Sequence, residues 1–182
     1  MPHNKGRQHR PSGWTSYRTP LLRALYVVRN MISSEEFENL KRMPDEYASI
    51  DYDRVFTLDE YERLRNGLYA RSMNEKWYAR FYDNSFYMFR SWSGNCIFEF
   101  DLKEVGKGYR VVSARANRNR EQYNADDDAY DVLFLDFLVS NLILGESKPY
   151  PSRNSSPLPK GLEQHVASGT SYQEVKTTKK AW

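Results

Sequence analysis

The stretch KWYARFYDNSFYMFRSWSGNCIFEFDLKEVGKGYRVVSARANRNREQY, residues 76–123, decides the fold of this chain. Four segments in it alternate apolar or aromatic residues with polar ones: 77–82, 86–90, 96–102 and 109–117. Turn-forming Asp, Asn, Ser and Gly residues separate them, at 83–85, 91–95 and 106–108. Because short turns join consecutive strands, the stretch predicts a four-stranded antiparallel meander.

An amphipathic pattern precedes the strands over residues 21–31, where apolar residues recur at intervals of three and four after Pro20. Ser33 and Glu36 then have the spacing of a capping box, which predicts a second helix that stops before Pro44. Two amino-terminal helices are therefore expected.

A loop and a further helix are expected between this region and the strands. Residues 45–55 are polar and mixed, which indicates a loop. Thr57 and Glu60 form a second capping-box pair that is followed by an apolar stripe, and they predict a helix over about 58–72.

A last helix is expected after the strands. The acidic run Asp126–Asp128 suits a helix start, because carboxylates are stabilised at the positive end of the helix dipole. The apolar stripe that follows includes Leu133 and Phe134, and Gly145 suits the position after the helix end. This helix is predicted to cover one face of the sheet.

The fold class that follows is α+β, with amino-terminal helices, a four-stranded antiparallel sheet and a covering carboxy-terminal helix in a single domain of residues 21–147. Residues 1–20 and 148–182 are rich in Pro, Gly, Ser and basic residues, and they are expected to be disordered tails.

Formal charge is divided unevenly along the chain. Its net value is +3, but residues 21–147 hold 17 basic and 22 acidic residues, so this domain carries −5 and the excess of positive charge lies in the tails. Specific nucleic-acid binding by the domain is therefore disfavoured.

Cysteine and histidine are too few in the domain for several kinds of site. Cys96 is the only cysteine, so neither an intrachain disulfide nor a cysteine-rich zinc site can form. His3, His9 and His165 all lie in the tails, which excludes a histidine-based triad or metal site within residues 21–147 unless a tail folds back. No metal and no cofactor are expected.

The amino terminus lacks the apolar centre of a secretory signal, and no apolar run reaches the roughly 18–20 residues of a membrane helix. An intracellular protein, cytoplasmic or nuclear and without membrane contact, is expected. A mitochondrial presequence is the alternative, because no acidic residue precedes Glu35. The prolines and glycines of residues 2–13 oppose the helix that a presequence forms.

Arg90 shares the strand parity of Phe86 and Met88, which predicts that its guanidinium lies partly shielded at the end of the core face. An unpaired buried charge is costly, so Arg90 needs a carboxylate or an anionic ligand. Two interpretations follow: an internal ion pair with Asp131 or Asp136, or a binding site for an anion.

Trp92 lies beside Arg90 in the turn of residues 91–94. Its indole is suited either to stack on a base or sugar next to a bound phosphate, or to plug the open end of the sheet. Gly94 and its neighbours are suited to present backbone amides to an anion, although a glycine in a turn needs no such purpose.

A second polar cluster, Asn117, Arg118 and Arg120, follows the fourth predicted strand. Antiparallel order brings the end of this strand beside the start of the third, and so beside the turn that follows Arg90. Arginine forks and amides bind phosphate and carboxylate groups. The sequence therefore predicts an anion-binding edge, with an exposed charged loop as the alternative. Its residues are Arg90, Trp92, Gly94, Asn95, Asn117, Arg118 and Arg120.

Two short motifs resemble those of a group of small, mainly bacterial proteins, R-S-W-T-G followed by N-R-x-x-E-Q-Y. They are Arg90-Ser91-Trp92-Ser93-Gly94, and Asn117-Arg118 followed by Glu121-Gln122-Tyr123. Some proteins of this group are associated with macrodomains that handle ADP-ribose. The resemblance spans residues 77–145, with Ser93 in place of the usual Thr and Phe89 in place of an expected His. It implies a shared role for Arg90, Trp92, Gly94, Asn117 and Arg118 but no particular activity.

Three functional hypotheses follow. The leading one is a non-enzymatic module that binds an anion (phosphate, a nucleotide or an ADP-ribose-like molecule) or an acidic protein partner at the predicted edge. The second is a hydrolase of a nucleotide or ADP-ribose conjugate, with Glu99, Asp101 or Glu121 as general base. The third is a protein-interaction scaffold that uses its basic tails for weak, salt-sensitive contacts. The sequence leaves the oligomeric state open.

Overall fold

The structure, a computed structural model, describes residues 40–70, 74–151 and 160–169. These residues belong to the second of the two compact units into which the chain divides, residues 39–182. The helix expected over 21–31 lies outside the described residues, as does most of the helix expected from Ser33. Residues 40–44, at the end of that second helix, are described and are not helical.

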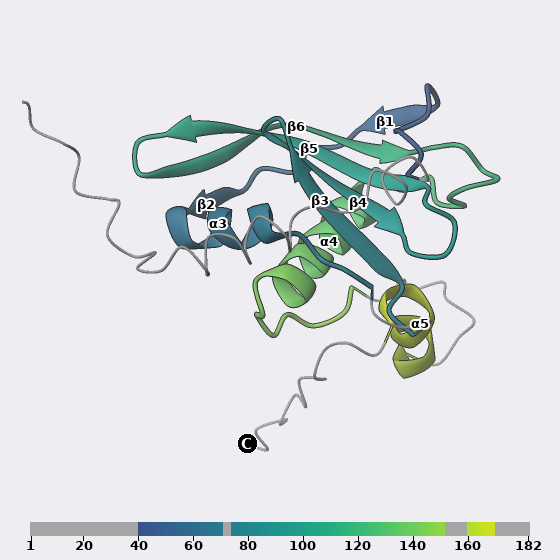
Figure 1. Ribbon diagram of the computed structural model, residues 1–182. Helices are drawn as coiled ribbons and strands as arrows, with labels where there is room; N and C mark the ends of the chain where they lie inside the picture. The colour runs from purple at the N-terminus through teal and green to yellow at the C-terminus, as the bar shows by residue number, and fades with distance from the viewer. Residues whose placement is uncertain (1–39, 71–73, 152–159, 170–182) are drawn as a thin grey trace, which may run out of the picture. The chain divides into compact units, whose positions relative to one another are not determined.

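One antiparallel sheet of six strands forms the centre of the fold (Figure 1). Its strands are β1 (Tyr47–Ser49), β2 (Val55–Thr57), β3 (Trp77–Tyr82), β4 (Ser85–Arg90), β5 (Cys96–Val105) and β6 (Gly108–Asn117). The order across the sheet is β1-β6-β5-β4-β3, and β2 also pairs with β6. The α+β class is confirmed, and the four predicted strands are consecutive neighbours in the sheet.

Two strands that the sequence does not predict complete the sheet. Residues 45–55, expected to be a loop, contain β1 and the start of β2. Both strands lie along the outer edge of β6, where Tyr47 faces Asn117 and Val55 faces Arg110. Strands of three residues are too short to show an alternating pattern, so the open backbone edge of β6 decides their pairing rather than local sequence.

The turns between the long strands have the chemistry that the sequence indicates. Asp83 and Asn84 both have positive φ, 49° and 63°, which is the backbone of a two-residue hairpin turn between β3 and β4. Gly106 begins the β5–β6 turn with φ 58°. These turns set the register of the core, in which Phe86 faces Phe100.

Helix α3 (Leu58–Asn66) begins where the capping box predicts. The Thr57 hydroxyl accepts a hydrogen bond from the Glu60 amide, and the Glu60 carboxylate accepts one from the Thr57 amide. The helix ends earlier than expected, because Gly67 (φ 65°) leaves it and lies against β3. A Cβ atom at Gly67 would meet the carbonyl oxygen of Ala79 at 2.5 Å, so glycine is required there.

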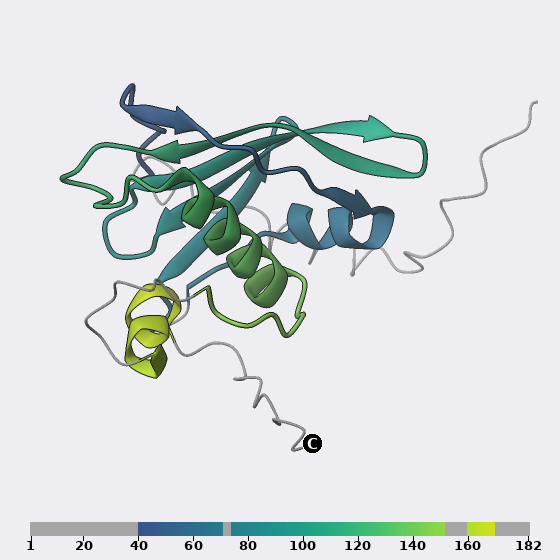
Figure 2. The same cartoon turned by 180° about the vertical axis from the view of Figure 1, so that it is seen from behind.

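Helix α4 (Asp128–Leu138) continues into the π-helical turn η1 (Val139–Ile143) and crosses one face of the sheet (Figure 2). Asp127 caps its amino end by accepting a hydrogen bond from the Tyr130 amide, which confirms the capping role of the acidic run. From this helix Phe134 contacts the rings of Trp77 and Phe98 in the sheet. The aromatic core therefore lies between α4 and the sheet.

The face of α4 that enters the core differs from the predicted stripe. Leu133 is 59% exposed, whereas Leu135 is fully buried together with Phe134 and Leu138. The two leucines flank Phe134 on the helix surface, so the sequence pattern alone does not decide which of them faces the sheet.

Helix α5 (Lys160–Ser168) lies in the stretch expected to be disordered, which corrects that expectation for these residues. A main-chain bridge between Glu75 and Gly169 joins its end to the residues before β3. Leu162 and Val166, its apolar residues four positions apart, remain about half exposed. Its contacts with the sheet include main-chain groups. Because any residue supplies such groups, the sequence shows no pattern that predicts these contacts.

Candidate functional site

The two sequence clusters lie at one end of the sheet. Strand β4 ends at Arg90, β5 begins at Cys96 and β6 ends at Asn117, and these strands are neighbours. The Asn117 side-chain amide donates a hydrogen bond to the carbonyl oxygen of Cys96 at 2.7 Å. The structure thus brings the clusters to the same end of the sheet, as antiparallel order predicts. Their side chains, however, have different partners.

Asn117 is fully buried, and both ends of its side-chain amide form hydrogen bonds. Its nitrogen also donates to the side-chain oxygen of Gln122 at 2.9 Å, and its oxygen accepts from the Asn119 amide at 2.8 Å. Asn117 therefore anchors the loop that follows β6.

Arg118 turns toward α4 and is neutralised there. Its guanidinium lies 2.7 Å from the Asp131 carboxylate and 2.5 Å from the Asp128 carboxylate. Asp131 is fully buried and also accepts a hydrogen bond from the Tyr123 hydroxyl at 2.7 Å. Burial lowers the pKa of Arg118, but the two carboxylates outweigh it and the pKa is raised. Arg118 thus ties the end of β6 to the start of α4.

Arg120 lies at the surface, where it forms an ion pair with Asp126 at 3.0 Å. Both side chains are about three-quarters exposed, so water and salt screen this pair. Arg118 and Arg120 therefore lie at the predicted edge but already have carboxylate partners.

The turn of residues 91–95 is closed by its own hydrogen bonds. The Gly94 amide donates to the carbonyl oxygen of Arg90 at 2.9 Å, and the Asn95 amide donates to the Ser93 hydroxyl at 3.3 Å. These two amides are therefore not available to an anion, contrary to one interpretation of the turn. The side-chain oxygen of Asn95 is buried and has no hydrogen-bond partner within the described ranges.

Arg90 lies in an aromatic enclosure on the α4 face of the sheet. The central carbon of its guanidinium is 4.2 Å from the ring centre of Trp77 and 5.3 Å from that of Trp92. One N–H group donates a hydrogen bond at 2.9 Å to the carbonyl oxygen of Ala167, near the end of α5. No carboxylate among the described residues forms an ion pair with Arg90.

Burial lowers the pKa of Arg90 to about 10, and the neighbouring Tyr123 and Tyr150 oppose this shift. The guanidinium is therefore still a cation at neutral pH. It is a partly shielded cation with no acid partner among the described residues.

The predicted internal ion pair of Arg90 is wrong. Asp131 pairs with Arg118 at 2.7 Å, and Asp136 pairs with Arg54 at 2.8 Å. Both acids were candidates because they follow the start of the last helix, but the sequence does not show which arginine each of them meets.

Trp92, beside Arg90, is 59% exposed and so is too open to plug the end of the sheet. The amino group of Lys76 lies 5.3 Å from the centre of its indole ring, the same distance as the Arg90 guanidinium carbon. An exposed indole with two cations beside it is suited to an aromatic or sugar ligand that carries negative charge. The sequence does not single out these neighbours, because Trp77 fits the pattern of β3 and Lys76 lies just before that strand.

Glu99 and Asp101, two of the candidate general bases, lie on the opposite face of the sheet from Arg90. Phe98 and Phe100 of the same strand are buried against α4 and its neighbours. Because successive side chains of a strand alternate between faces, the two carboxylates point away from α4.

Both carboxylates have partners on that opposite face. Glu99 lies 2.5 Å from Arg115 on β6, and Asp101 accepts a hydrogen bond from the Ser85 hydroxyl at 2.5 Å. Burial raises the pKa of Glu99, and Arg115 opposes this shift. Neither carboxylate is placed to activate water beside Arg90.

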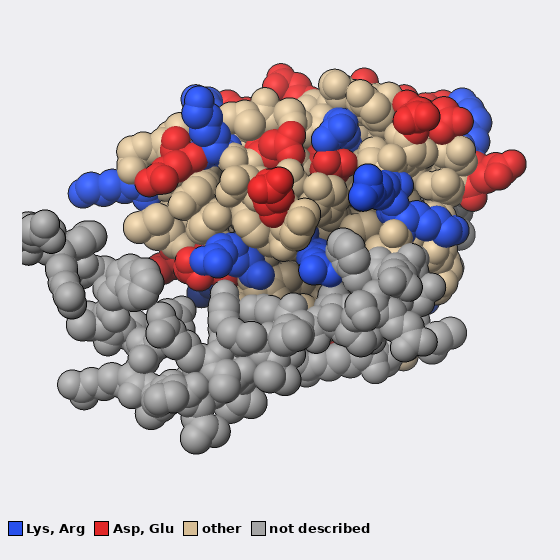
Figure 3. All heavy atoms as spheres, turned by 45° about the horizontal axis from the view of Figure 1, so that its top comes forward, with Lys and Arg blue, Asp and Glu red and all other residues tan. Residues whose placement is uncertain are grey.

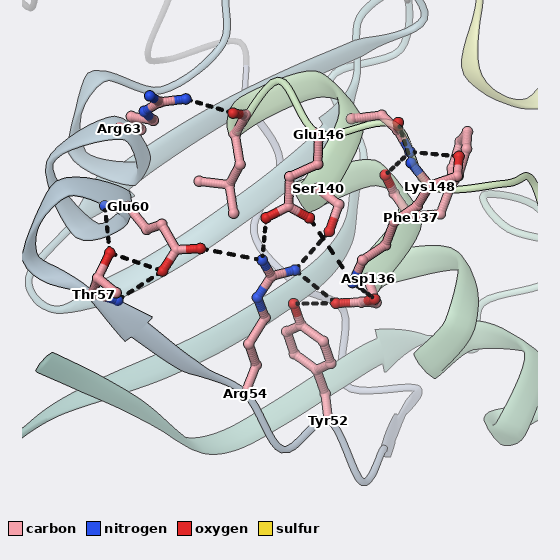
Figure 4. Close-up of polar contacts among 12 residues, drawn as sticks. Tyr52, Arg54, Thr57, Glu60, Arg63, Asp136, Phe137, Ser140, Glu146 and Lys148 are labelled. Atoms are coloured by element: carbon pink, nitrogen blue, oxygen red, sulfur yellow. Dashed lines mark hydrogen bonds and ion pairs between the residues drawn. The ribbon is translucent and has the colours of Figure 1, made fainter. Parts of the chain in front are cut away.

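Another cluster of charged side chains, which the sequence does not indicate, centres on Arg54 (Figure 4). The Arg54 guanidinium lies 2.8 Å from the Asp136 carboxylate, 3.0 Å from that of Glu146 and 3.6 Å from that of Glu60. It also donates to the Ser140 hydroxyl at 2.7 Å. Arg54 thus connects the start of β2 with α3, α4 and the chain after η1.

Lys148 completes this Arg54 cluster with a second cation, 2.5 Å from Asp136 and 4.0 Å from Glu146. The cluster then holds two cations and three carboxylates, and each charged group has an opposite partner. Arg54 is only 14% exposed. The arrangement indicates a structural role, in which the cluster holds these elements together. The sequence could not reveal it, because Asp136, Ser140 and Glu146 lie more than 80 positions from Arg54.

Charged side chains of both signs intermingle on the face shown in Figure 3, without a continuous basic surface among its coloured residues. In the described part of the chain, no three metal-ligating side chains gather into a site. Within those same ranges, no helix is both long enough and apolar enough to cross a membrane.

Comparison of the chain with protein-family models, with curated proteins and with solved structures finds no match. Function is therefore inferred from the geometry of Arg90 and its neighbours.

Proposed function

We propose that the protein is a module that binds an anionic ligand at Arg90. The observation that carries this proposal is an unbalanced charge. Arg90 is shielded between two tryptophans, and among the described residues the one hydrogen bond of its guanidinium is to a neutral carbonyl group. A buried cation without a counter-charge is costly, and a bound anion would remove that cost.

The other shielded arginines support this interpretation by contrast. Arg118 has two carboxylate partners and Arg54 has three, although both are more than four-fifths buried. These two shielded arginines are therefore paired with acids, whereas Arg90 has no acid partner among the described residues. A shielded arginine of this kind is typical of a binding site.

The surroundings of Arg90 favour a phosphate-bearing ligand with a ring or sugar, such as a nucleotide or an ADP-ribose-like molecule. Trp92 offers an exposed stacking surface, and Lys76 lies beside the same ring. An arginine fork is suited to hold a phosphate through two hydrogen bonds. An acidic protein partner is the alternative ligand, because a carboxylate offers the same pair of oxygens.

We propose binding rather than hydrolysis for this site. The carboxylates of Glu99 and Asp101 lie on the far face of the sheet, and Glu121 is exposed. A general base must come within hydrogen-bond reach of the reacting group. Glu99 and Asp101 do not come within reach of a group bound at Arg90, because the sheet lies between them. An intracellular location and the resemblance to the R-S-W-T-G proteins stay predictions.

The test is a thermal-shift panel on the full chain with inorganic pyrophosphate, ADP and ADP-ribose. A ligand at a hundred times its Kd stabilises a fold by about 2.7 kcal/mol, which is readily measured. Arg90→Gln is expected to abolish the shift. The matched control is Arg110→Gln, which removes the same charge from an exposed ion pair with Asp53 and is expected to retain the shift.

Trp92→Ala separates the two parts of the proposed ligand. Because the side chain is largely exposed, the variant is expected to fold as the wild type does. It is expected to lose affinity for ADP by about 1–3 kcal/mol, the usual contribution of one stacked base, and to keep its affinity for pyrophosphate. A ligand shift that survives Arg90→Gln, or no shift with any ligand, would reject the proposal.

A further inference from the structure

The end of α5 occupies the place beside Arg90 that the proposed ligand needs. The carbonyl oxygen of Ala167 accepts two hydrogen bonds, from the Arg90 guanidinium and from the Trp77 indole N–H, each at 2.9 Å. Two donors that converge on one oxygen are the arrangement with which a protein holds a carboxylate or phosphate oxygen.

Ala167 lies in the last turn of α5, where carbonyl groups have no partner within the helix. The helix dipole places a partial negative charge of about half an elementary charge at this end. The end of α5 is therefore a weak substitute for an anion, and a ligand with a full negative charge is the stronger partner for Arg90.

We propose that α5 is a latch that competes with the ligand for Arg90. In the absence of an anion, the Ala167 carbonyl accepts the hydrogen bonds of Arg90 and Trp77. When an anion binds, one of its oxygens accepts them instead, and α5 leaves the sheet. This inference rests on the proposed function, because it concerns the regulation of the same site.

The described attachment of α5 is concentrated at its carboxy end, and the rest of the helix is more exposed. A helix of nine residues is marginal in water without tertiary contacts. Leu162 and Val166 are 47% and 55% exposed, so they contribute little burial. The described contacts lie at its carboxy end, where Ala167 accepts the two hydrogen bonds and packs against the core and Ser168 is fully buried. Gly169, just after the helix, bridges Glu75 before β3.

Gly169 offers a way to open the latch without changing Arg90, Trp77 or Trp92. It has φ 84°, and a Cβ atom there would meet the carbonyl oxygen of Asn74 at 2.4 Å. Gly169→Val is therefore expected to push the end of α5 away from the chain before β3.

Val166→Pro is an independent second variant. Proline in the interior of a helix removes a hydrogen bond and clashes with the preceding turn, and the replaced side chain is exposed. Val166→Ala is its matched control, because it shortens the same exposed side chain and keeps the helix.

Calorimetric titration of the full chain with inorganic pyrophosphate measures the competition. If the latch is open in about a tenth of the wild-type molecules, both Gly169→Val and Val166→Pro are expected to bind about tenfold more tightly. Val166→Ala is expected to bind as the wild type does. In hydrogen exchange, pyrophosphate is expected to speed the exchange of α5 amides in the wild type.

The outcomes separate the latch from the proposed function. Equal pyrophosphate affinity in all four proteins, or slower exchange of α5 on binding, would refute the latch and leave binding at Arg90 intact. Absence of binding in the wild type and in both opened variants would refute both. If Gly169→Val does not fold, the comparison of Val166→Pro with Val166→Ala decides alone.

Discussion

The guanidinium of Arg90 and the carbonyl oxygen of Ala167 lie 2.9 Å apart, although 77 positions separate the two residues in the sequence. A desolvated cation thus meets the end of a helix dipole instead of a carboxylate. Arg54 and Arg118 have acid partners inside the fold, whereas no described acid forms an ion pair with Arg90. The predictions below test this division.

Arg118→Ala is expected to destabilise the protein by about 3–5 kcal/mol, because it leaves the fully buried Asp131 carboxylate without its cation. Arg120→Ala, two positions later, is the matched control. It removes an arginine from an exposed pair with Asp126 and is expected to leave stability unchanged. Urea unfolding measures both. Similar effects of the two substitutions would show that Arg118 has no structural role.

The Arg54 cluster is expected to hold the start of β2 to α4. Arg54→Met keeps an unbranched apolar side chain but removes the cation that Asp136 and Glu146 share, and a loss of about 3 kcal/mol is expected in urea unfolding. Arg110→Met, in an exposed pair with Asp53, serves as the control and is expected to have no measurable effect. An unchanged unfolding midpoint for Arg54→Met would mean that the Arg54 cluster does not stabilise the fold.

Gly67 and Gly106 both have positive φ but differ in their surroundings. A Cβ atom at Gly67 would meet the carbonyl oxygen of Ala79 at 2.5 Å, whereas one at Gly106 would meet nothing within 4 Å. Gly106→Ala is therefore expected to cost about 1 kcal/mol from backbone strain alone, and Gly67→Ala at least about 2 kcal/mol. Thermal unfolding of the two variants gives the comparison, and equal losses would show that α3 does not approach β3 so closely.

The capping box of α3 is expected to make stability depend on pH. Burial alone would raise the pKa of Glu60, but hydrogen bonds from Thr57 and the Arg54 guanidinium outweigh it and hold the pKa below 4.5. A carboxyl whose pKa is lower in the folded state stabilises the fold above its unfolded pKa, and this contribution is lost as pH falls through the folded pKa.

Glu60→Gln is therefore expected to lower the Tm at neutral pH and to weaken the fall of Tm below pH 4.5. Thermal unfolding across that range measures it, and Glu62→Gln, at an exposed position of the same helix, is the control. Parallel Tm profiles for the wild type and Glu60→Gln would contradict the expectation.

Local chemistry in the sequence predicted the central features of the fold. Alternation of apolar residues located the strands, Asp83 and Asn84 marked a turn, and Thr57 with Glu60 marked the start of α3. These features depend on residues a few positions apart, so the sequence displays them directly.

Features that depend on distant or main-chain partners could not be predicted. Strands β1 and β2 form because β6 has an open edge. Each has only three residues, too few to show an alternation of apolar and polar side chains. The partner of Arg90 is a main-chain carbonyl, which any residue at position 167 would supply. The sequence placed Arg90 and Arg118 at one end of the sheet, but the directions of their side chains depend on α4 and α5.

Binding of an anion by the Arg90 guanidinium is measured most directly by side-chain NMR of isotope-labelled full-length protein. The Nε–H resonance of Arg90, identified by its absence from the spectrum of Arg90→Lys, is predicted to shift and saturate as inorganic pyrophosphate is added, while the Arg110 resonance stays in place. An Arg90 resonance that does not move, or shifts of equal size at Arg90 and Arg110 that never saturate, would contradict an anion site at Arg90.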